Sequence, residues 1–208
     1  MLLSTFFFTS CQKKIDYFDY VSELRSNIFI AKNDSFSLRV YAVVKESPYG
    51  TDGIPREKSS IMETYLLTPE ANKTVTITFQ IAEQSYGGEM SYDNVKGEYF
   101  YSCSADVAQL SSIPCLIVYG EETTEITASS VITANTISPQ NALRILQTQQ
   151  PELFSALTDK YGFAGEIYIR LIFEEVPYYY IGIIDRNEKC NAFLMNAETG
   201  KVLARRES

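Results

Sequence analysis

Apolar and polar residues alternate in short runs from residue 17 to about residue 133. The runs 36–42 and 75–81 are the clearest, because every second residue in each of them is apolar. An alternation with a period of two predicts a strand with one buried face. Further strand candidates cover residues 21–31, 61–67, 97–103, 115–119 and 125–132.

Turn signals separate these candidates at residues 33–34, 69–72, 87–88 and 119–122. About seven short strands within roughly 115 residues are typical of a two-sheet sandwich of the immunoglobulin or fibronectin type. True immunoglobulin domains carry a Cys…Trp…Cys signature, and this chain has no tryptophan. The label therefore describes an expected architecture and implies no function.

The hydrophobic pattern changes after residue 133. Residues 133–138 read as a linker, and Ser138-Pro139 is typical of a helix start, with serine as the N-cap and proline in the first turn. Pro151 interrupts the helical pattern. Strand candidates then follow at residues 166–173, 178–185, 190–196 and 201–204.

The expected fold class is mainly β with a small α+β part at the C-terminal end. We expect a β-sandwich domain at residues 15–134 and a helix followed by an antiparallel sheet at residues 138–208. The second part has only about 70 residues, which is marginal for independent stability. We therefore expect it to be stabilised by packing against the sandwich.

Residues 138–205 resemble the PepSY domain. The stretch Ser138-Pro-Gln-Asn-Ala-Leu143 resembles its capped opening helix, and Asn196-Ala-Glu-Thr-Gly-Lys-Val-Leu203 resembles its closing D-A-x-T-G-x-V-L motif. Asn196 replaces the usual aspartate, and Pro151 breaks the helical region. The resemblance implies a secreted or membrane-attached bacterial protein, because PepSY domains occur in such proteins and are associated with the inhibition or regulation of peptidases.

Residues 1–11 resemble the end of a bacterial lipoprotein signal peptide. The apolar run is too short to span a bilayer, and the small residues Thr9 and Ser10 directly precede Cys11. No basic residue precedes Cys11, so we interpret residues 1–11 as the remnant of a longer signal peptide. The resemblance implies a lipid on Cys11 and an extracytoplasmic, membrane-anchored protein of the cell envelope. The alternative is an apolar stub that packs on the fold.

Composition excludes several chemistries. The chain has no histidine, which removes Ser-His-Asp and Cys-His catalysis as well as histidine-ligated zinc. A net charge of −8 argues against nucleic acid as a partner. An enzyme without histidine would need two carboxylates in one cleft, and no spacing in the sequence suggests such a pair. We therefore expect no enzymatic activity, no cofactor and no bound metal.

Three cysteines remain if Cys11 carries lipid, namely Cys103, Cys115 and Cys190. No C-x-x-C pair exists, so neither a zinc ribbon nor a thioredoxin-type site is indicated. Cys103 and Cys115 each lie in a strand candidate and could form a bridge, because the environment outside the cytoplasm is oxidising. The interpretation that we favour is three small buried apolar residues.

Two groups of tyrosines are the candidate binding surface. Tyr49 lies in a long connection at residues 47–59, and Tyr178, Tyr179 and Tyr180 are consecutive in a strand candidate. Alternation in a strand places one of the three rings on the face opposite the other two, so the core takes at least one ring. We expect a non-enzymatic, lipid-anchored binding or regulatory protein that acts on a peptidase or another envelope protein. The alternative is a surface lipoprotein that binds a solute or a glycan.

Overall fold

The computed structural model describes residues 15–48, 50, 53–71 and 73–208. Cys11 and Tyr49 lie outside the described residues, so the expectations for these two side chains stay predictions. The described chain is mainly β, with its α-helices gathered toward the C-terminal end. This arrangement confirms the fold class predicted from the hydrophobic pattern.

The described residues of the first part of the chain form a short 3₁₀ helix and nine strands. Their bounds are η1 (Tyr17–Tyr20), β1 (Val21–Lys32), β2 (Ser37–Glu46), β3 (Lys58–Leu67), β4 (Val75–Ile81), β5 (Gln84–Glu89), β6 (Ser91–Asp93), β7 (Glu98–Cys103), β8 (Ser112–Tyr119) and β9 (Glu122–Ser130). All seven predicted strands are present. The two short strands β5 and β6 were not predicted, because neither has a run of alternating apolar residues.

These strands form a sandwich-like pair of layers. One layer has the order β1-β2-β3-β7-β6, and β9, β8, β4 and β5 form the other. β9 also pairs with the end of β1, which joins the layers along one side. The apolar residues of the two clearest alternating runs fill the space between the layers, and among them Leu38, Val40, Ile77 and Phe79 have no exposed surface.

The second part of the chain forms two helices and six strands. Their bounds are α1 (Pro139–Gln149), α2 (Pro151–Ala156), β10 (Thr158–Asp159), β11 (Gly162–Phe163), β12 (Gly165–Phe173), β13 (Pro177–Asp185), β14 (Cys190–Asn196) and β15 (Val202–Glu207). The Ser138 side chain accepts a hydrogen bond from the backbone N–H of Asn141, which confirms the predicted cap. A new helix begins at Pro151, as expected where proline interrupts the first.

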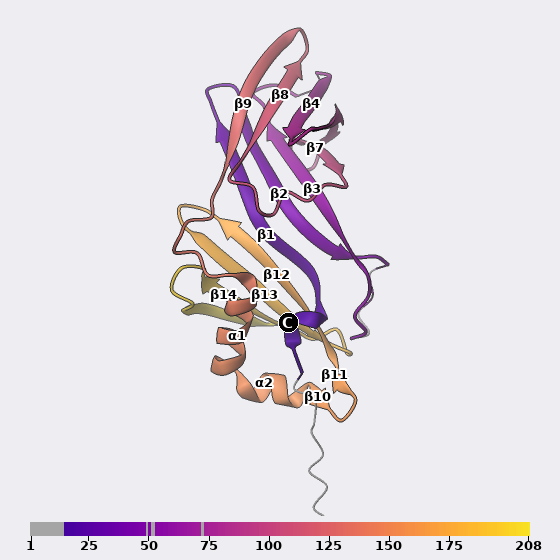
Figure 1. The fold of residues 1–208 in the computed structure, drawn as a ribbon, viewed down its shortest axis with the longest axis vertical. Helices are drawn as coiled ribbons and strands as arrows, with labels where there is room; N and C mark the ends of the chain where they lie inside the picture. The colour runs from indigo at the N-terminus through magenta and orange to yellow at the C-terminus, as the bar shows by residue number, and fades with distance from the viewer. Residues whose placement is uncertain (1–14, 49, 51–52, 72) are drawn as a thin grey trace, which may run out of the picture.

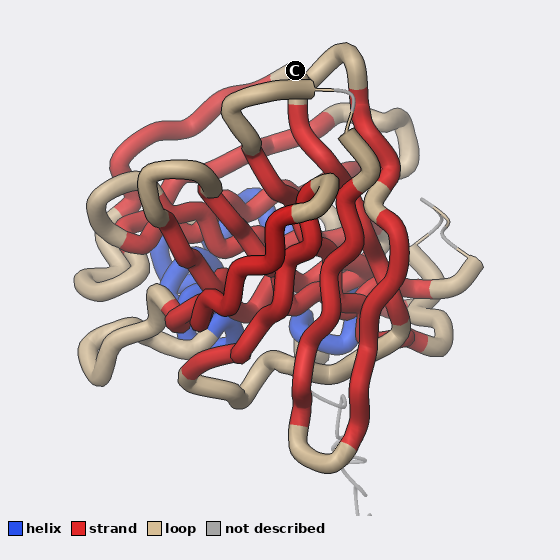
Figure 2. The backbone as a smooth tube through the Cα atoms, turned by 90° about the horizontal axis from the view of Figure 1, so that it is seen from above, coloured by secondary structure: helices blue, strands red, loops and turns tan. Residues whose placement is uncertain are grey.

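β1 connects the two parts. Its first half pairs in parallel with β12, from Val21 opposite Ile167 to Arg25 opposite Arg170, and its second half pairs with β9. One sheet therefore runs from β15 to β6 in the order β15-β14-β13-β12-β1-β2-β3-β7-β6. Figure 1 shows the sandwich and the helices at opposite ends of the long axis, and Figure 2 shows the helices behind the strands when this axis is viewed from above.

α1 and α2 cover one face of strands β12–β14 and form a second core with them. This core includes Leu143 and Leu146 of α1, Phe154 of α2, and Tyr179 of β13, all of which are buried. The hydroxyl of Tyr179 donates a hydrogen bond to the backbone oxygen of Ile137 at 2.7 Å. Of the three consecutive tyrosines, Tyr179 is thus the one whose side chain is buried in the core.

The turn between β14 and β15 forms as the sequence predicts. The Asn196 side-chain oxygen accepts hydrogen bonds from the backbone N–H groups of Glu198 and Thr199. Gly200 has a φ of 69°, a conformation that favours glycine. The turn chemistry is confirmed, whereas the resemblance to the PepSY domain stays a prediction.

Candidate binding surface

β15 is the outer strand of the sheet at the C-terminal end. Among the described strands it pairs with β14 only, and its residues are exposed except for Val202, which is half-buried. An outer strand presents one row of backbone N–H and C=O groups that no neighbouring strand uses. β15 therefore offers an extended segment of another chain a ready line of hydrogen-bonding partners.

The pairing pattern shows which backbone groups of β15 point outward. Ser208 and Cys190 exchange two backbone hydrogen bonds of 3.0 Å each, just beyond the end of β15. Hydrogen-bonded and non-bonded pairs alternate along an antiparallel ladder. Arg206 therefore bonds to β14, whereas Arg205 and Glu207 direct their backbone N–H and C=O groups away from it.

Two arginines and one glutamate lie along β15 beside the apolar residues 202–204, with further lysines close by. Lys201, Arg205 and Arg206 are exposed, and Lys189 forms an ion pair with Glu207. One nitrogen of Arg205 donates a hydrogen bond of 2.8 Å to the Asn191 side chain. A basic edge on a chain with a net charge of −8 favours an acidic segment as its partner.

Three tyrosines lie on the face of this sheet that α1 and α2 leave uncovered. Tyr178 and Tyr180 point to the side opposite Tyr179 and are half-buried. Tyr168 of β12 joins them, with its ring centre 5.8 Å from that of Tyr180. Two of the predicted tyrosines thus lie on one surface two strands away from β15, and Tyr179 does not.

The ring of Tyr168 lies flat across β13. It passes over Gly182, the residue with which Tyr168 is paired, and its hydroxyl lies 3.4 Å from the sulfur of Cys190. Burial raises the pKa of Tyr168, and the contacts with Cys190 and Tyr180 raise it further. Tyr168 therefore stays a neutral hydroxyl and covers the middle of the face.

Charged and aromatic side chains continue this face across β1, β2 and β3. Arg170 makes two hydrogen bonds to Glu23, at 2.7 and 2.9 Å. Next to this ion pair, the guanidinium of Arg25 lies 4.1 Å from the centre of the Tyr41 ring, and Tyr41 lies 5.4 Å from Tyr65. The rings of Tyr41 and Tyr65 are thus in contact with neighbouring side chains.

Burial also changes the chemistry of Tyr65. It raises the pKa of this tyrosine to about 12, and the charge of Glu63 adds to the shift. Tyr65 and Tyr168 are therefore hydrogen-bonding and apolar groups at neutral pH, and neither of them is a base.

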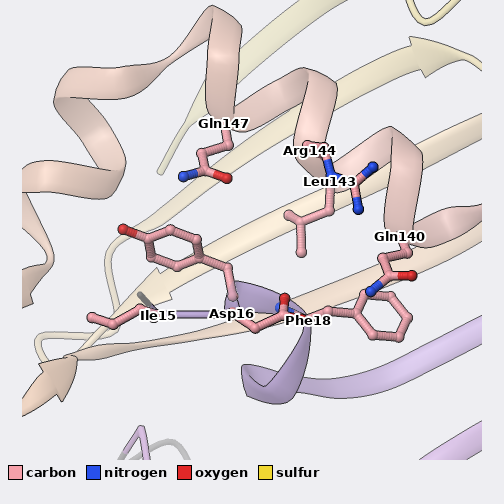
Figure 3. Close-up of a pocket in the computed structure, with 8 residues that line it drawn as sticks. Ile15, Asp16, Phe18, Gln140, Leu143, Arg144 and Gln147 are labelled. Carbon is pink, nitrogen blue, oxygen red and sulfur yellow. The ribbon is translucent and has the colours of Figure 1, made fainter. Parts of the chain in front are cut away.

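A shallow pocket of about 270 Å³ lies between the first described residues and α1. Figure 3 shows Leu143 pointing from α1 toward this segment, with Gln140, Arg144 and Gln147 along the same helix. Tyr17 packs edge-on against Phe154 of α2, with ring centres 4.9 Å apart. The first described residues therefore pack against the helices.

The structure describes three of the cysteines, and all three are free thiols: Cys103, Cys115 and Cys190. Cys115 is buried in the sandwich core, and Cys103 packs against the same core. Burial raises the pKa of Cys115 to about 12. The prediction of a small buried apolar residue is confirmed for Cys115, whereas Cys103 and Cys190 are only half-buried.

The described residues contain no group of three or more cysteine, aspartate or glutamate side chains arranged to hold a metal ion. Within the same residues, no helix is long and apolar enough to cross a membrane.

Comparison with protein-family models, with curated proteins and with solved structures finds no match for this chain. Sequence reasoning identified Tyr178 and Tyr180 but missed Tyr168, Arg205 and Arg206. The adjacent arginines near the C-terminal end were the available signal, but only the pairing of β15 shows that they lie on a free edge.

Proposed function

We propose that this protein is a non-enzymatic, lipid-anchored binding protein of the bacterial cell envelope, and that it regulates a peptidase or another envelope protein. The partner contributes an extended acidic segment, which adds to the sheet as a strand beside β15. The observation that carries this proposal is the exposed edge of β15, with outward backbone groups at Arg205 and Glu207.

Strand addition supplies both affinity and selectivity. Backbone hydrogen bonds to the edge give affinity without regard to sequence, and side chains on alternating faces select the segment. The basic residues Lys201, Arg205 and Arg206 favour carboxylates in the partner. Because these residues are exposed, salt is expected to weaken the attraction.

The proposed anchor fits the position of the first described residues. Ile15 lines the pocket against α1, so a lipid on Cys11 would hold the helical end of the molecule near the membrane. The sandwich would then face away from the bilayer. Mass spectrometry of the protein purified from bacterial membranes tests the anchor, because a lipidated Cys11 adds the mass of its acyl chains and an unmodified Cys11 contradicts it.

The binding proposal is tested by blocking the edge with proline. Arg205→Pro removes an outward N–H and leaves the hydrogen bonds between β14 and β15 intact, because the N–H of Arg205 does not bond to β14. We expect the wild-type protein to capture a partner from envelope extract and Arg205→Pro to lose at least about 90% of that capture, given the dependence of strand addition on main-chain bonds.

Arg205→Ala is the matched control. It removes the same guanidinium but keeps the outward N–H, so we expect a partial loss of capture that disappears at high salt. Circular dichroism and thermal melting of both variants check that the sheet remains folded. If no partner is captured, or if Arg205→Pro captures as much as Arg205→Ala, strand addition at β15 is wrong.

A second candidate is a surface lipoprotein that binds a solute or a glycan. The observation in its favour is a hollow of about 200 Å³ lined by Tyr65, Tyr92 and Phe100, with Asp93, Lys96 and Glu98 also in its wall. Aromatic rings beside charged groups suit a sugar. Binding to a glycan array that Tyr92→Ala abolishes would favour this candidate over strand addition.

A further inference from the structure

A second strand with a free edge lies in the sandwich. β9 pairs with β8 from Glu122 to Ser129, but it pairs with β1 only at Ser129 and Ser130. No other described strand pairs with β9. The side of β9 that faces away from β8 is therefore free between Thr123 and Thr127. Figure 1 shows β8 and β9 extending to the end of the molecule that lies farthest from the helices.

The pairing pattern shows which backbone groups of β9 point outward. The backbone N–H of Ser130 donates a hydrogen bond of 2.8 Å to the backbone oxygen of Ser111. Bonded and non-bonded pairs alternate along the ladder from this point. The even-numbered residues of β9 therefore bond to β8, whereas Thr123, Glu125 and Thr127 direct their N–H and C=O groups away from it. The side chains of these three residues are exposed.

The free edge of β9 is acidic. Glu122 and Glu125 are exposed, and residues 120–130 contain no lysine or arginine. The free edge of β15, by contrast, carries Arg205 and Arg206. Because the two edges have opposite charges, each edge attracts the other and repels a second copy of itself.

We propose that β9 of one molecule adds to the sheet of a second molecule, antiparallel to and beside β15 of that molecule. The two strands lie in different parts of the chain, so the contact is head-to-tail and leaves one β9 and one β15 free at the ends of an open assembly. The proposal rests on strand addition at β15, and it identifies a second copy of this chain as a source of the acidic segment.

Charge selects one register for this contact. Placing Glu125 opposite Arg205 brings three outward residues of β9 against three outward residues of β15. Only outward groups can bond across the contact, so the register changes in steps of two residues. One step places Glu125 opposite Glu207, and a step in the other direction places Glu121 opposite Glu207. Opposite charges across a strand pair stabilise it and like charges destabilise it, so the first register is favoured.

Sedimentation velocity of the purified full chain tests the assembly. Cys11→Ser is present in every sample, so that no lipid can drive association. A contact made by one pair of strands is small and belongs to the weak class of interfaces, so we expect the mean sedimentation coefficient to rise over about 5–500 μM protein. The rise should become smaller at high salt, because the charged residues of both edges are exposed.

Proline variants block one edge at a time. Glu125→Pro and Arg205→Pro each remove an outward N–H that makes no bond within its own sheet. Each variant alone should stay monomeric over the whole concentration range. Their mixture should form a dimer that grows no further, because β9 of one variant and β15 of the other are still open. Circular dichroism checks that both variants are folded.

A charge exchange tests the register. Glu125→Arg and Arg205→Glu should each weaken association at least about fivefold, since each places like charges opposite one another. The double variant Glu125→Arg/Arg205→Glu restores an opposite pair and should associate within about twofold of the wild type. Glu83→Arg is the matched control for the change in net charge, because Glu83 is exposed in the turn between β4 and β5.

Four results would overturn the proposal: a wild type that stays monomeric at 500 μM, an assembly that Glu125→Pro leaves intact, a mixture of the proline variants that forms no dimer, and a Glu83→Arg variant that weakens association as much as Glu125→Arg. Capture of a partner from envelope extract is a separate measurement on β15. A monomeric wild type that still captures a partner, and loses it with Arg205→Pro, would refute self-assembly and retain strand addition.

Discussion

The ring of Tyr168 occupies the space that a side chain on Gly182 would need. The two residues are paired across β12 and β13, and a β-carbon at position 182 would clash with the tyrosine ring. Glycine usually weakens a strand interior. Here its missing side chain lets an aromatic ring lie flat on the uncovered face of the sheet.

Gly182→Ala is therefore expected to displace Tyr168 and to lower the free energy of unfolding by about 1–3 kcal/mol, as overpacking does. Urea denaturation measures the change. The control is the same substitution in a Tyr168→Ala background, where the alanine has room and should cost less than about 0.5 kcal/mol. Equal costs in the two backgrounds would show that the ring and the glycine are not coupled.

Asn27 is expected to be a critical polar residue of β1. It is 2% exposed, and its amide donates hydrogen bonds to the backbone oxygens of Ala108 and Leu110 at 3.1 and 3.3 Å. Asn27→Ala leaves these acceptors without their donor, so we expect a loss of about 2–3 kcal/mol in stability. Urea denaturation again provides the measurement. Asn94→Ala, in an exposed turn, should change stability by less than about 0.5 kcal/mol.

The ion pair between Glu23 and Arg170 predicts a dependence of stability on pH. Burial alone would raise the pKa of Glu23, but the hydrogen bonds and charge of Arg170 outweigh it, with help from Lys45 and Arg25, and lower the pKa. A carboxyl whose pKa is lower in the folded state stabilises the fold above its unfolded-state pKa, near about 4.3. That contribution is lost as the pH falls through the folded-state pKa.

Arg170→Met should therefore reduce stability by about 1 kcal/mol at pH 7, a modest value because the arginine is partly exposed. The difference from the wild type should shrink as the pH falls from 6 to 3. Urea midpoints across this range measure it. Lys189→Met is the control, because the Glu207 carboxylate that it pairs with is exposed at the chain end. A constant difference for Arg170→Met at all pH values would contradict the assignment.

The buried thiols should resist modification in the folded protein. Because burial raises the pKa of Cys115 to about 12, we expect this thiol to react with iodoacetamide at pH 8 at least about 100-fold more slowly than in the unfolded chain, since only the thiolate reacts. Peptide mass mapping after pulse labelling identifies each site. Cys103, Cys115 and Cys190 should all become labelled in denaturant without reductant; protection of any two there would indicate a disulfide.

Local sequence chemistry determined the secondary structure to a large extent. The alternating runs predicted all seven strands of the sandwich part, because a strand that buries one face must place apolar residues at every second position. The cap at Ser138, the break at Pro151 and the turn at Gly200 followed from the conformations that these residue types favour. β5 was missed because Gly87 and Gly88 were interpreted as a turn, and that prediction is wrong: both residues lie inside β5, where Gly87 allows the close approach to β4.

The candidate site was only partly predictable. Alternation indicated that Tyr178 and Tyr180 share one face and Tyr179 the other, and the structure confirms it. The sequence did not show that Tyr168 joins them or that Arg205 lies on a free edge. Both depend on which strands pair and in which register, and the local pattern of apolar residues determines neither.

The sequence by itself determined whether most segments are helix, strand or turn, and it determined the residues that form the turns. It also excluded histidine-based chemistry. These properties depend on single residues and their near neighbours. Only the tertiary structure decided that β1 belongs to both halves and that β15 is the outer strand. The pairing of β1 with β12 joins residues more than a hundred positions apart, and the free edge of β15 depends on where every other strand lies. No local period or motif encodes them, since they result from the way the whole chain buries its apolar surface.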